Sequence, residues 1–568
     1  MKQATNFFVR FSTPRSISAI APFGKTATAV LYDETEQAAL VVPTENGAYE
    51  SPSIEFPAMG AANCREYPVF AMHVKLKNPE TTFGRFYWHT DAVSDLRQKL
   101  EGTGANVGYW QFIRKVQPDY APTTDWQLCV ADFSEMHHPY FQGNWQIAML
   151  TLMRIDGEGV TTDDGVYIDW MGWFSSVADA YEYADLPYEA PKKEEVQRPA
   201  NEQRAMESSL KINNRLNGDL KRLSSVERVL VSDYDPKQTF KHHPDITYFK
   251  GKFYVSFSSG VKDEDHPGQK MVYCVSDDFY HWSEPMDVVV PGVTPQTDSK
   301  FTEAPTSIIG GFTVKGDRLC FLYTVTDYHP ECFREDGSFN TNHLGKATYR
   351  NYMVSSEDGI YWSKPTQPDA NCRNNMMLPS PYGMHRWYEF YGKQASYSDD
   401  GEHWTTTRAT DAQIAASVAR CPGQLTESAG FQSPDGVVHN FIRSDCGYIW
   451  QNESYDNGET WTEFYPTNFT SASSMFKLIY LPDGRIAWIG SPYYDTRWPL
   501  TLYVSEDGYN FNKGYILCDD VYEMKTDGWA KGGQIAYPHV MIRDEYLYVF
   551  YSKQKEVTEI LRVKLTEL

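Results

Sequence analysis

The segment Ser356-Glu-Asp-Gly-Ile-Tyr-Trp362 is one of five copies of a single turn pattern in the C-terminal part of the chain. In this pattern an Asp side chain caps the amides of a tight hairpin turn, a Gly adopts positive φ, and the closing aromatic ring packs between neighbouring sheets. The closing aromatic residues are 80, 42, 57 and 50 residues apart, and five such hairpins predict a β-propeller. The other copies are Ser276–Trp282, Ser398–Trp404, Ser454–Trp461 and Ser505–Phe511.

A sixth repeat, Ala536–Leu565, lacks the turn but is equally rich in strand-forming residues. The strand Val226–Val231 is predicted to pair with it and so to join the two ends of a ring. Six blades are therefore predicted. The 80-residue gap between the first two turns leaves room for a seventh blade or for a long loop over residues 327–346.

The repeated turn resembles the Asp box of the sialidase superfamily, and the resemblance covers about residues 226–568. It implies that this region is a sialidase-like β-propeller and the catalytic domain. Because Asp boxes are structural, they indicate a fold and do not indicate a reaction.

The first 190 residues consist of short alternating strands and polar loops, for example Thr26–Asp33, Tyr67–Leu76 and Gly165–Phe174. This pattern predicts a β-sandwich of the jelly-roll type, which is either a carbohydrate-binding module or a support for the propeller. Residues 191–225 are dense in charge and poor in apolar side chains, and they are predicted to form a helical linker. The predicted fold class is therefore all-β.

The 568-residue chain has a net charge of -23, which argues against nucleic acid and anionic membranes as partners. No stretch is apolar for 18 residues and the N-terminus lacks the core of a signal peptide, so we expect a soluble protein, cytoplasmic or secreted with its signal removed.

Nine Cys without a CxxC pair favour buried thiols over disulfides or a zinc site. We expect no cofactor and no metal site, although a propeller is compatible with a structural calcium ion.

Chemistry in a propeller is expected near the start of each inner strand, because a closed ring brings those positions together at its axis. The residues there that we interpret as catalytic are His242, His243, Glu427 and Tyr537. Those that we interpret as substrate-binding are Arg443, Arg497, Glu303, Arg386 and Asp245.

Four of these candidates stand in the order that sialidases show: Glu427, Arg443, Arg497 and Tyr537. The resemblance implies that the Glu activates the Tyr as a nucleophile and that the arginines grip a sugar carboxylate. Guanidinium groups suit that task because they form charge-assisted, often bidentate hydrogen bonds.

Two other sialidase features are missing. His242-His243-Pro244-Asp245 replaces the Arg-Ile-Pro motif that carries the first carboxylate-binding arginine. The catalytic Asp has no clear equivalent, and Asp263, Asp265 and His266 are candidates by position only. The His pair and the segment Glu264–Gln269 resemble instead the branch that contains the propeller α-L-rhamnosidases and rhamnosyl-glucuronate lyases.

The leading hypothesis is an exo-acting enzyme that cleaves a glycosidic bond next to an acidic sugar, such as rhamnosyl-glucuronate, by elimination or hydrolysis. A lyase needs the uronate charge neutralised, here by Arg443 and Arg497, and a neutral His or a Tyr to take the C5 proton. The two alternatives are a sialidase-type hydrolase with a substituted arginine triad and a non-catalytic glycan-binding propeller. In each case the partner is an oligosaccharide or polysaccharide.

Overall fold

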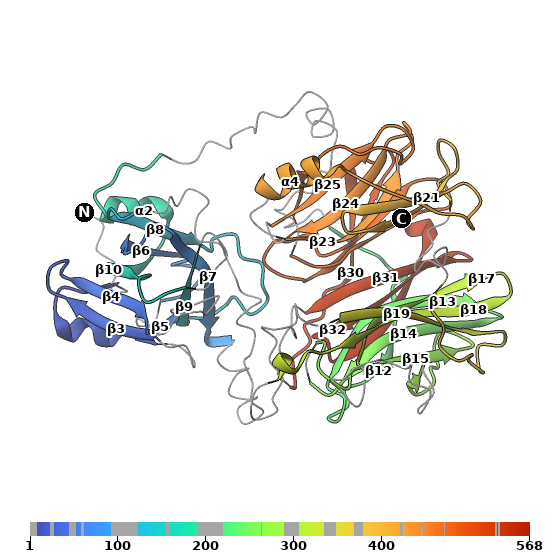
Figure 1. Ribbon diagram of the computed structural model, residues 1–568, viewed down its shortest axis with the longest axis horizontal. Coiled ribbons are helices and arrows are strands. Elements are labelled where there is room, and N and C mark those ends of the chain that lie inside the picture. Colours follow the sequence, from blue (N-terminus) through green and yellow to red (C-terminus); the bar gives the residue numbers. More distant parts are fainter. Residues whose placement is uncertain are drawn as a thin grey trace. The chain divides into compact units, whose positions relative to one another are not determined.

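The computed structural model divides the chain into two compact units, residues 1–196 and 197–568 (Figure 1). It describes residues 8–22, 28–44, 53–57, 62–92, 123–154, 160–189, 220–262, 264–288, 306–333, 348–368, 379–420, 424–444, 447–470, 472–526, 528, 531 and 534–568. Among these residues, no helix has the length and apolar character needed to cross a membrane.

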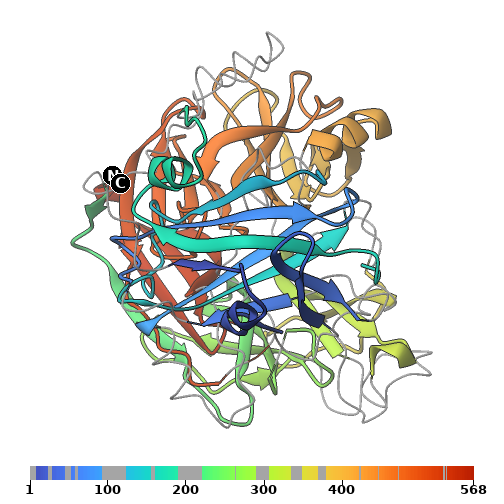
Figure 2. The ribbon, with the colours of Figure 1, turned by 90° about the vertical axis from the view of Figure 1, so that its left-hand side faces the viewer.

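The N-terminal unit contains two antiparallel sheets, whose strands can be followed in Figure 2. One sheet has the order β3 (Thr28–Asp33), β4 (Ala38–Pro43), β10 (Val166–Phe174), β6 (Val69–Leu76) and β8 (Gln127–Asp132), with β1 (Phe8–Arg10) paired to β10. The other has the order β2 (Ala21–Pro22), β5 (Ser53–Pro57), β9 (Trp145–Arg154) and β7 (Thr81–Thr90). The described helices are η1 (Pro14–Ala19) and α2 (Val177–Tyr183).

One apolar core joins the two sheets. The rings of Trp145 on β9 and Trp173 on β10 stack with their centroids 3.9 Å apart. On β6, Met72 and Val74 enter this core while His73 between them stays partly exposed, which is the two-residue period of a strand. The predicted β-sandwich is thereby confirmed.

The predicted helical linker, 191–225, lies mostly outside the described residues. Its last part is extended: β11 (Lys221–Arg222) pairs in parallel with β30 (Phe511–Cys518) of the second unit. These residues therefore belong to a propeller sheet and not to a helix.

Six sheets make up the described part of the second unit (Figure 1), and the first strand of each contributes residues to one common pocket. The first three are β13–β16 (Phe240–Phe249, Lys252–Gly260, Lys270–Ser276, Met286–Asp287), β17–β19 (Thr306–Lys315, Arg318–Asp327, Thr348–Ser356) and β20–β22 (Trp387–Tyr391, Gln394–Ser398, Thr405–Arg408). The fourth and fifth are β23–β26 (Leu425–Gln432, Val438–Ser444, Tyr448–Ser454, Tyr465–Thr470) and β27–β30 (Lys477–Tyr480, Ile486–Gly490, Leu500–Ser505, Phe511–Cys518). The sixth is β31–β33 (Ile535–Arg543, Tyr546–Lys553, Val557–Lys564) with β12 (Glu227–Ser232).

The two ends of this unit meet in its last sheet. Strand β12 pairs antiparallel with β33, so that Glu227 lies opposite Arg562. Figure 1 shows the last strands (red) beside the first ones (green). The all-β class and the propeller are confirmed, the closing strand lies where the sequence predicted it, and the number of blades stays a prediction. The described helices of this unit are short: η3 (Pro330–Cys332), α4 (Asp411–Arg420) and η5 (Leu565–Glu567).

The repeated turns have the geometry predicted from their residues. Oδ1 of Asp358 accepts hydrogen bonds from the backbone amides of Ile360 (2.8 Å) and Tyr361 (2.9 Å). Gly359 has φ +76°, and a Cβ on it would lie 2.0 Å from Oη of Tyr254, so no other residue fits there. The same amide caps are made by Asp278, Asp400, Asp456 and Asp507.

The closing Trp residues pack against the preceding sheet. Nε1 of Trp461 donates to Oγ1 of Thr407 at 3.0 Å, and this indole is only 6% exposed. Trp362 donates to Oη of Tyr273 at 3.3 Å but is half-buried, as is Trp404. The packing of the closing rings between sheets is therefore most complete at Trp461, and Trp362 and Trp404 are only partly buried.

Candidate active site

Tyr537 is the centre of a polar cluster at the propeller axis. Its phenolic hydroxyl donates to Oε1 of Glu427 at 2.5 Å and accepts from Nη1 of Arg443 at 2.7 Å. The same Arg443 nitrogen lies 2.9 Å from both Glu427 oxygens. Strands β23, β24 and β31 thus bring a phenol, a carboxylate and a guanidinium into mutual contact.

The second arginine adjoins the first through Ser473. Arg443 donates to Oγ of Ser473 from Nε (3.2 Å) and Nη2 (3.1 Å), and Arg497 donates from Nη2 to the Ser473 carbonyl (2.9 Å). Cζ of Arg497 lies 5.9 Å from the centre of the Tyr537 ring. Nη1 of Arg497 is buried and has no hydrogen-bond partner in the described part of the chain. A buried donor of this kind is unfavourable until a ligand accepts its hydrogen.

The histidine pair packs on the other side of the Tyr537 ring. The ring centroids of His242 and His243 lie 4.2 Å and 5.8 Å from that of Tyr537. Nδ1 of His242 bonds Oγ of Ser552 (3.0 Å), and Nδ1 of His243 bonds Oγ of Ser258 (2.9 Å). Both imidazoles are therefore held in fixed orientations beside the phenol.

Backbone irregularities in the inner strands explain why these side chains turn toward the axis. The pairing of β13 shifts between His242 and Asp245, and the pairing of β31 shifts between Ala536 and His539. Within these bulges His243 and Tyr537 have φ +53° and +52°, a conformation that side chains other than Gly adopt only at a cost. A third bulge, between Leu425 and Ser428 in β23, contains Glu427. Such bulges re-aim side chains next to active sites.

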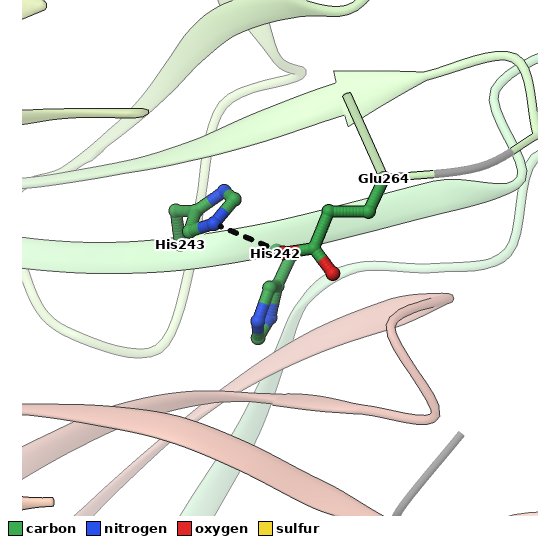
Figure 3. Close-up of side chains that lie close together, drawn as sticks. All are labelled: His242, His243 and Glu264. Carbon is green, nitrogen blue, oxygen red and sulfur yellow. Dashed lines mark ion pairs between the residues drawn. The ribbon is translucent and has the colours of Figure 1, made fainter. Parts of the chain in front are cut away.

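Two charged residues join the cluster that the sequence analysis did not single out. Nζ of Lys555 lies 2.6 Å from Oε2 of Glu264, and Oε1 of Glu264 lies 3.3 Å from Nε2 of His243 (Figure 3). Glu264 stood inside the segment that carried the family resemblance, which was a usable signal. Lys555 occupies the turn between β32 and β33 with φ +54°, and no local pattern in the sequence marks that turn as part of the site.

Burial and neighbouring charges shift the pKa values of the groups in this cluster. Burial raises the pKa of Glu427, but the positive charge of Arg443 and the hydrogen bonds from Thr426 and Tyr537 together outweigh burial and lower that pKa to about 2. Burial raises the pKa of Tyr537, lowers the pKa of His242 well below its ordinary value, and lowers the pKa of Lys555 to about 8 against the pull of Glu264. At neutral pH the proton therefore stays on Tyr537, and Glu427 is a carboxylate.

A pocket of about 1200 Å³ lies along the axis and is lined by residues from all six innermost strands, β13, β17, β20, β23, β27 and β31. His243, Glu264, Glu427 and Tyr537 border it. Two residues further along β13 and β31, Asp245 and His539 also face the pocket.

Asp245 occupies a separate position in this pocket. It accepts hydrogen bonds from Nε2 of His539 (3.0 Å) and from the amide of Phe312 (2.6 Å). Burial raises the pKa of Asp245 to about 7. The residue thus belongs to the pocket but makes no described contact with Tyr537 or the two arginines.

The structure brings together six of the nine predicted site residues: His242, His243, Glu427, Arg443, Arg497 and Tyr537. Arg386 does not join them, because its guanidinium binds Asp399 (2.7 Å) and Glu459 (3.4 Å) in two of the repeated turns. Glu303 and Asp263 lie outside the described residues. Asp265 and His266 bond within their own loop, to Gln269 and Pro267.

The fold and the site together define an Asp-box β-propeller with a polar axial cluster. A family model described as "BNR repeat-like domain" matches residues 251–549, and the chain belongs to this family. No curated protein matches the sequence.

Several solved structures are similar in fold. A protein titled "Sialidase" is 18% identical with a TM-score of 0.43, and the match covers 61% of this chain and 34% of that one. A protein of unknown function from Dyadobacter fermentans is 16% identical (TM-score 0.42; 60% and 100% covered), and the intramolecular trans-sialidase from Ruminococcus gnavus, solved with oseltamivir carboxylate, is 15% identical (TM-score 0.39; 59% and 96% covered). This chain thus matches about a third of the length of the first.

Proposed function

We propose that this chain is an exo-acting enzyme that cleaves a glycosidic bond next to an acidic sugar of an oligosaccharide or polysaccharide. The observation that carries the proposal is the contact of Tyr537 with both Glu427 (2.5 Å) and Arg443 (2.7 Å), at an axial pocket that Tyr537 and Glu427 line. A phenol held between a carboxylate and a guanidinium has a proton acceptor on one side and a stabilising positive charge on the other.

Charge supports an anionic sugar as the substrate. In a protein of net charge -23, the cluster gathers Arg443, Arg497 and Lys555 at one place. The buried Nη1 of Arg497 offers a donor without a protein acceptor, and a sugar carboxylate would satisfy it by a charge-assisted bond. Lys555 would supply the third positive charge that the missing Arg-Ile-Pro motif supplies in sialidases.

Hydrolysis is the reaction that the Tyr537–Glu427 contact favours. The phenolic oxygen would attack the anomeric carbon while its proton passes to Glu427, and the bond to the leaving oxygen would break as that oxygen takes a proton from solvent. Water would then attack the same carbon and lose a proton to solvent, and Tyr537 would leave with the proton returned from Glu427. In the free protein Glu427 is a weak base because Arg443 lowers its pKa to about 2. A substrate carboxylate that binds Arg443 would share this charge, and Glu427 would become more basic only when substrate is present.

Elimination is the second candidate, and the histidine pair favours it. The His242 ring lies 4.2 Å from the Tyr537 ring, and burial keeps this imidazole neutral. For a rhamnosyl-glucuronate, an imidazole or the phenol would take the C5 proton, a C4–C5 double bond would form, and rhamnose would leave with a proton from the second group. Arg443 and Arg497 would neutralise the uronate and so acidify C5–H.

Digestion of a panel of glycans with sialic acid or rhamnosyl-glucuronate termini, analysed by mass spectrometry, tests the proposal. Release of a terminal sugar without new ultraviolet absorbance supports hydrolysis, and release with an absorbing unsaturated uronate supports elimination. Tyr537→Phe should slow the formation of either product roughly 10²- to 10⁴-fold, whereas the exposed Tyr361→Phe should not. Binding of an acidic glycan with no product from any of the panel would overturn the proposal in favour of a glycan-binding propeller.

A further inference from the structure

The residues His242, His243 and Glu264 form a compact group of metal-ligand type. One ligand atom from each lies within 4.8 Å of the other two. The close-up shows the three side chains near one another (Figure 3). The histidines come from β13, and Glu264 comes from the loop after β14. We propose that these three residues bind one divalent transition-metal ion of the zinc type, since two imidazoles and a carboxylate are a common ligand set for such ions. The inference goes beyond the proposed function, and it is compatible with hydrolysis and with an elimination in which the phenol of Tyr537 takes the proton.

One ring nitrogen of His242, Nε2, has no hydrogen-bond partner among the described residues. Oγ of Ser552 lies 3.4 Å from the carbonyl of Ala536 and 3.0 Å from Nδ1 of His242. When the hydroxyl donates to this carbonyl, Nδ1–H of His242 donates to Ser552. Nε2 is then a lone pair. It is buried and has no hydrogen-bond partner in the part of the chain that the structure describes. A buried lone pair without a partner is unfavourable, and a bound metal ion would remove that cost.

The hydrogen bonds of His243 lead to the same result. Oγ of Ser258 donates to the carbonyl of His242 (3.0 Å), so Nδ1–H of His243 donates to Ser258 (2.9 Å). The Nε2 lone pair then faces Oε1 of Glu264 at 3.3 Å. Two acceptors at this distance need a proton or a cation between them. Two ligands about 2.0–2.1 Å from a tetrahedral ion are themselves about 3.3–3.4 Å apart, which matches this separation.

Ser552 and Ser258 also supply the outer contacts that metal-binding histidines usually have. A ligating imidazole typically donates its second N–H to an oxygen, which fixes the ring and the tautomer. Both histidines do so here, through independent hydroxyl groups on β32 and β14. The arrangement thus provides oriented ligands as well as ligands of the right type.

Lys555 opposes the binding of a cation and gives the sharpest test. Its ammonium lies 2.6 Å from Oε2 of Glu264, which leaves Oε1 for the metal and makes the carboxylate a monodentate ligand. A positive charge this close weakens the affinity for a dication. Lys555→Met should therefore strengthen metal binding by on the order of tenfold or more, a gain that a misfolded variant cannot mimic.

The test uses the full-length protein, stripped with a chelator, equilibrated with Zn²⁺ and dialysed. We expect one zinc ion per chain by mass spectrometry of the metal content, and a visible absorption band when Co²⁺ replaces it. His242→Ala and Glu264→Gln should lose the ion, and Ser258→Ala should weaken binding about 10- to 100-fold. His539→Ala is the matched control and should keep the ion, because this buried histidine binds Asp245 in the same pocket instead.

Circular dichroism of each variant separates loss of the ion from loss of the fold. Wild-type protein that holds no more Zn²⁺ or Co²⁺ than folded Glu264→Gln would overturn the inference. So would metal binding that survives in both His242→Ala and Glu264→Gln. Activity of the chelator-stripped protein on glycans would not bear on it, which keeps this test separate from that of the proposed function.

Discussion

The hydroxyl of Tyr537 lies 2.5 Å from a carboxylate oxygen of Glu427, although the two residues are 110 positions apart. Tyr537 belongs to the last sheet of the ring and Glu427 to the fourth. Their contact exists only because the strands between them complete the ring around one axis. Arg443 binds both residues, so the three form a single unit whose protonation is set jointly.

Tyr537→Phe should lower kcat/KM roughly 10²- to 10⁴-fold on any glycan that the wild type cleaves. The ring that packs on His242 remains, and only the reactive hydroxyl is lost. The free energy of unfolding should change little. Steady-state kinetics and urea unfolding on the same preparation check both points. Kinetics equal to those of the exposed Tyr448→Phe would remove Tyr537 from the mechanism.

Arg443→Ala should weaken recognition of an acidic sugar by about 2–5 kcal/mol, because a substrate carboxylate would lose its charged partner. This corresponds to a kcat/KM lower by about 30-fold to several thousandfold. Arg443→Lys should recover part of the loss, since it restores the charge without the bidentate geometry. The control is Arg222→Ala, whose guanidinium is 69% exposed. Equal activity of Arg443→Ala and this control would contradict the assignment.

Glu427→Gln should make the free energy of unfolding depend less on pH below about pH 4.5. The folded pKa of Glu427, about 2, is below the ordinary 4.5, so its ionised form stabilises the fold above pH 4.5. That contribution is lost as the pH falls from about 4.5 toward 2. Urea unfolding at pH 6, 4 and 3 should show a steeper fall for the wild type than for the variant. Parallel curves would mean that the Arg443 contact contributes nothing.

Trp461→Ala should cost roughly 3–5 kcal/mol of stability, because a nearly fully buried indole and its bond to Thr407 are lost. Trp362→Ala should cost clearly less, since this ring is half-buried. Urea unfolding measures both, and neither change should alter glycan affinity in the folded fraction. An equal cost would show that exposure at the turn does not determine the contribution of the ring.

Much of the architecture was predictable because its signals are local. Each Asp-box turn is built within about seven residues, and the carboxylate of Asp358 reaches amides only two and three positions ahead. Alternation of exposed and buried residues in β6 is equally local. The order of Glu427, Arg443, Arg497 and Tyr537 along the chain indicated which sheets carry the site. The expectation that each residue begins an inner strand was wrong for the arginines, because Arg443 lies on β24 and Arg497 lies between β28 and β29.

The composition of the site was only partly predictable. Arg386 sits at the equivalent position of its own sheet, yet its charge binds Asp399 and Glu459 instead of facing the axis. Lys555 and Glu264 join the cluster from loops of the last and first sheets, 291 residues apart. Their proximity depends on how the ring closes, which no local pattern reports.

The sequence alone determined the repeat and the propeller, because a hairpin turn and a strand period are satisfied by neighbours in the chain. Only the tertiary structure decided which side chains meet. Ring closure places the first and last sheets side by side, and bulges with positive φ at His243 and Tyr537 turn those side chains toward the axis. The physical reason is that ring closure and the bulges both depend on strands paired across the whole ring. Residues hundreds of positions apart therefore decide together where these side chains lie.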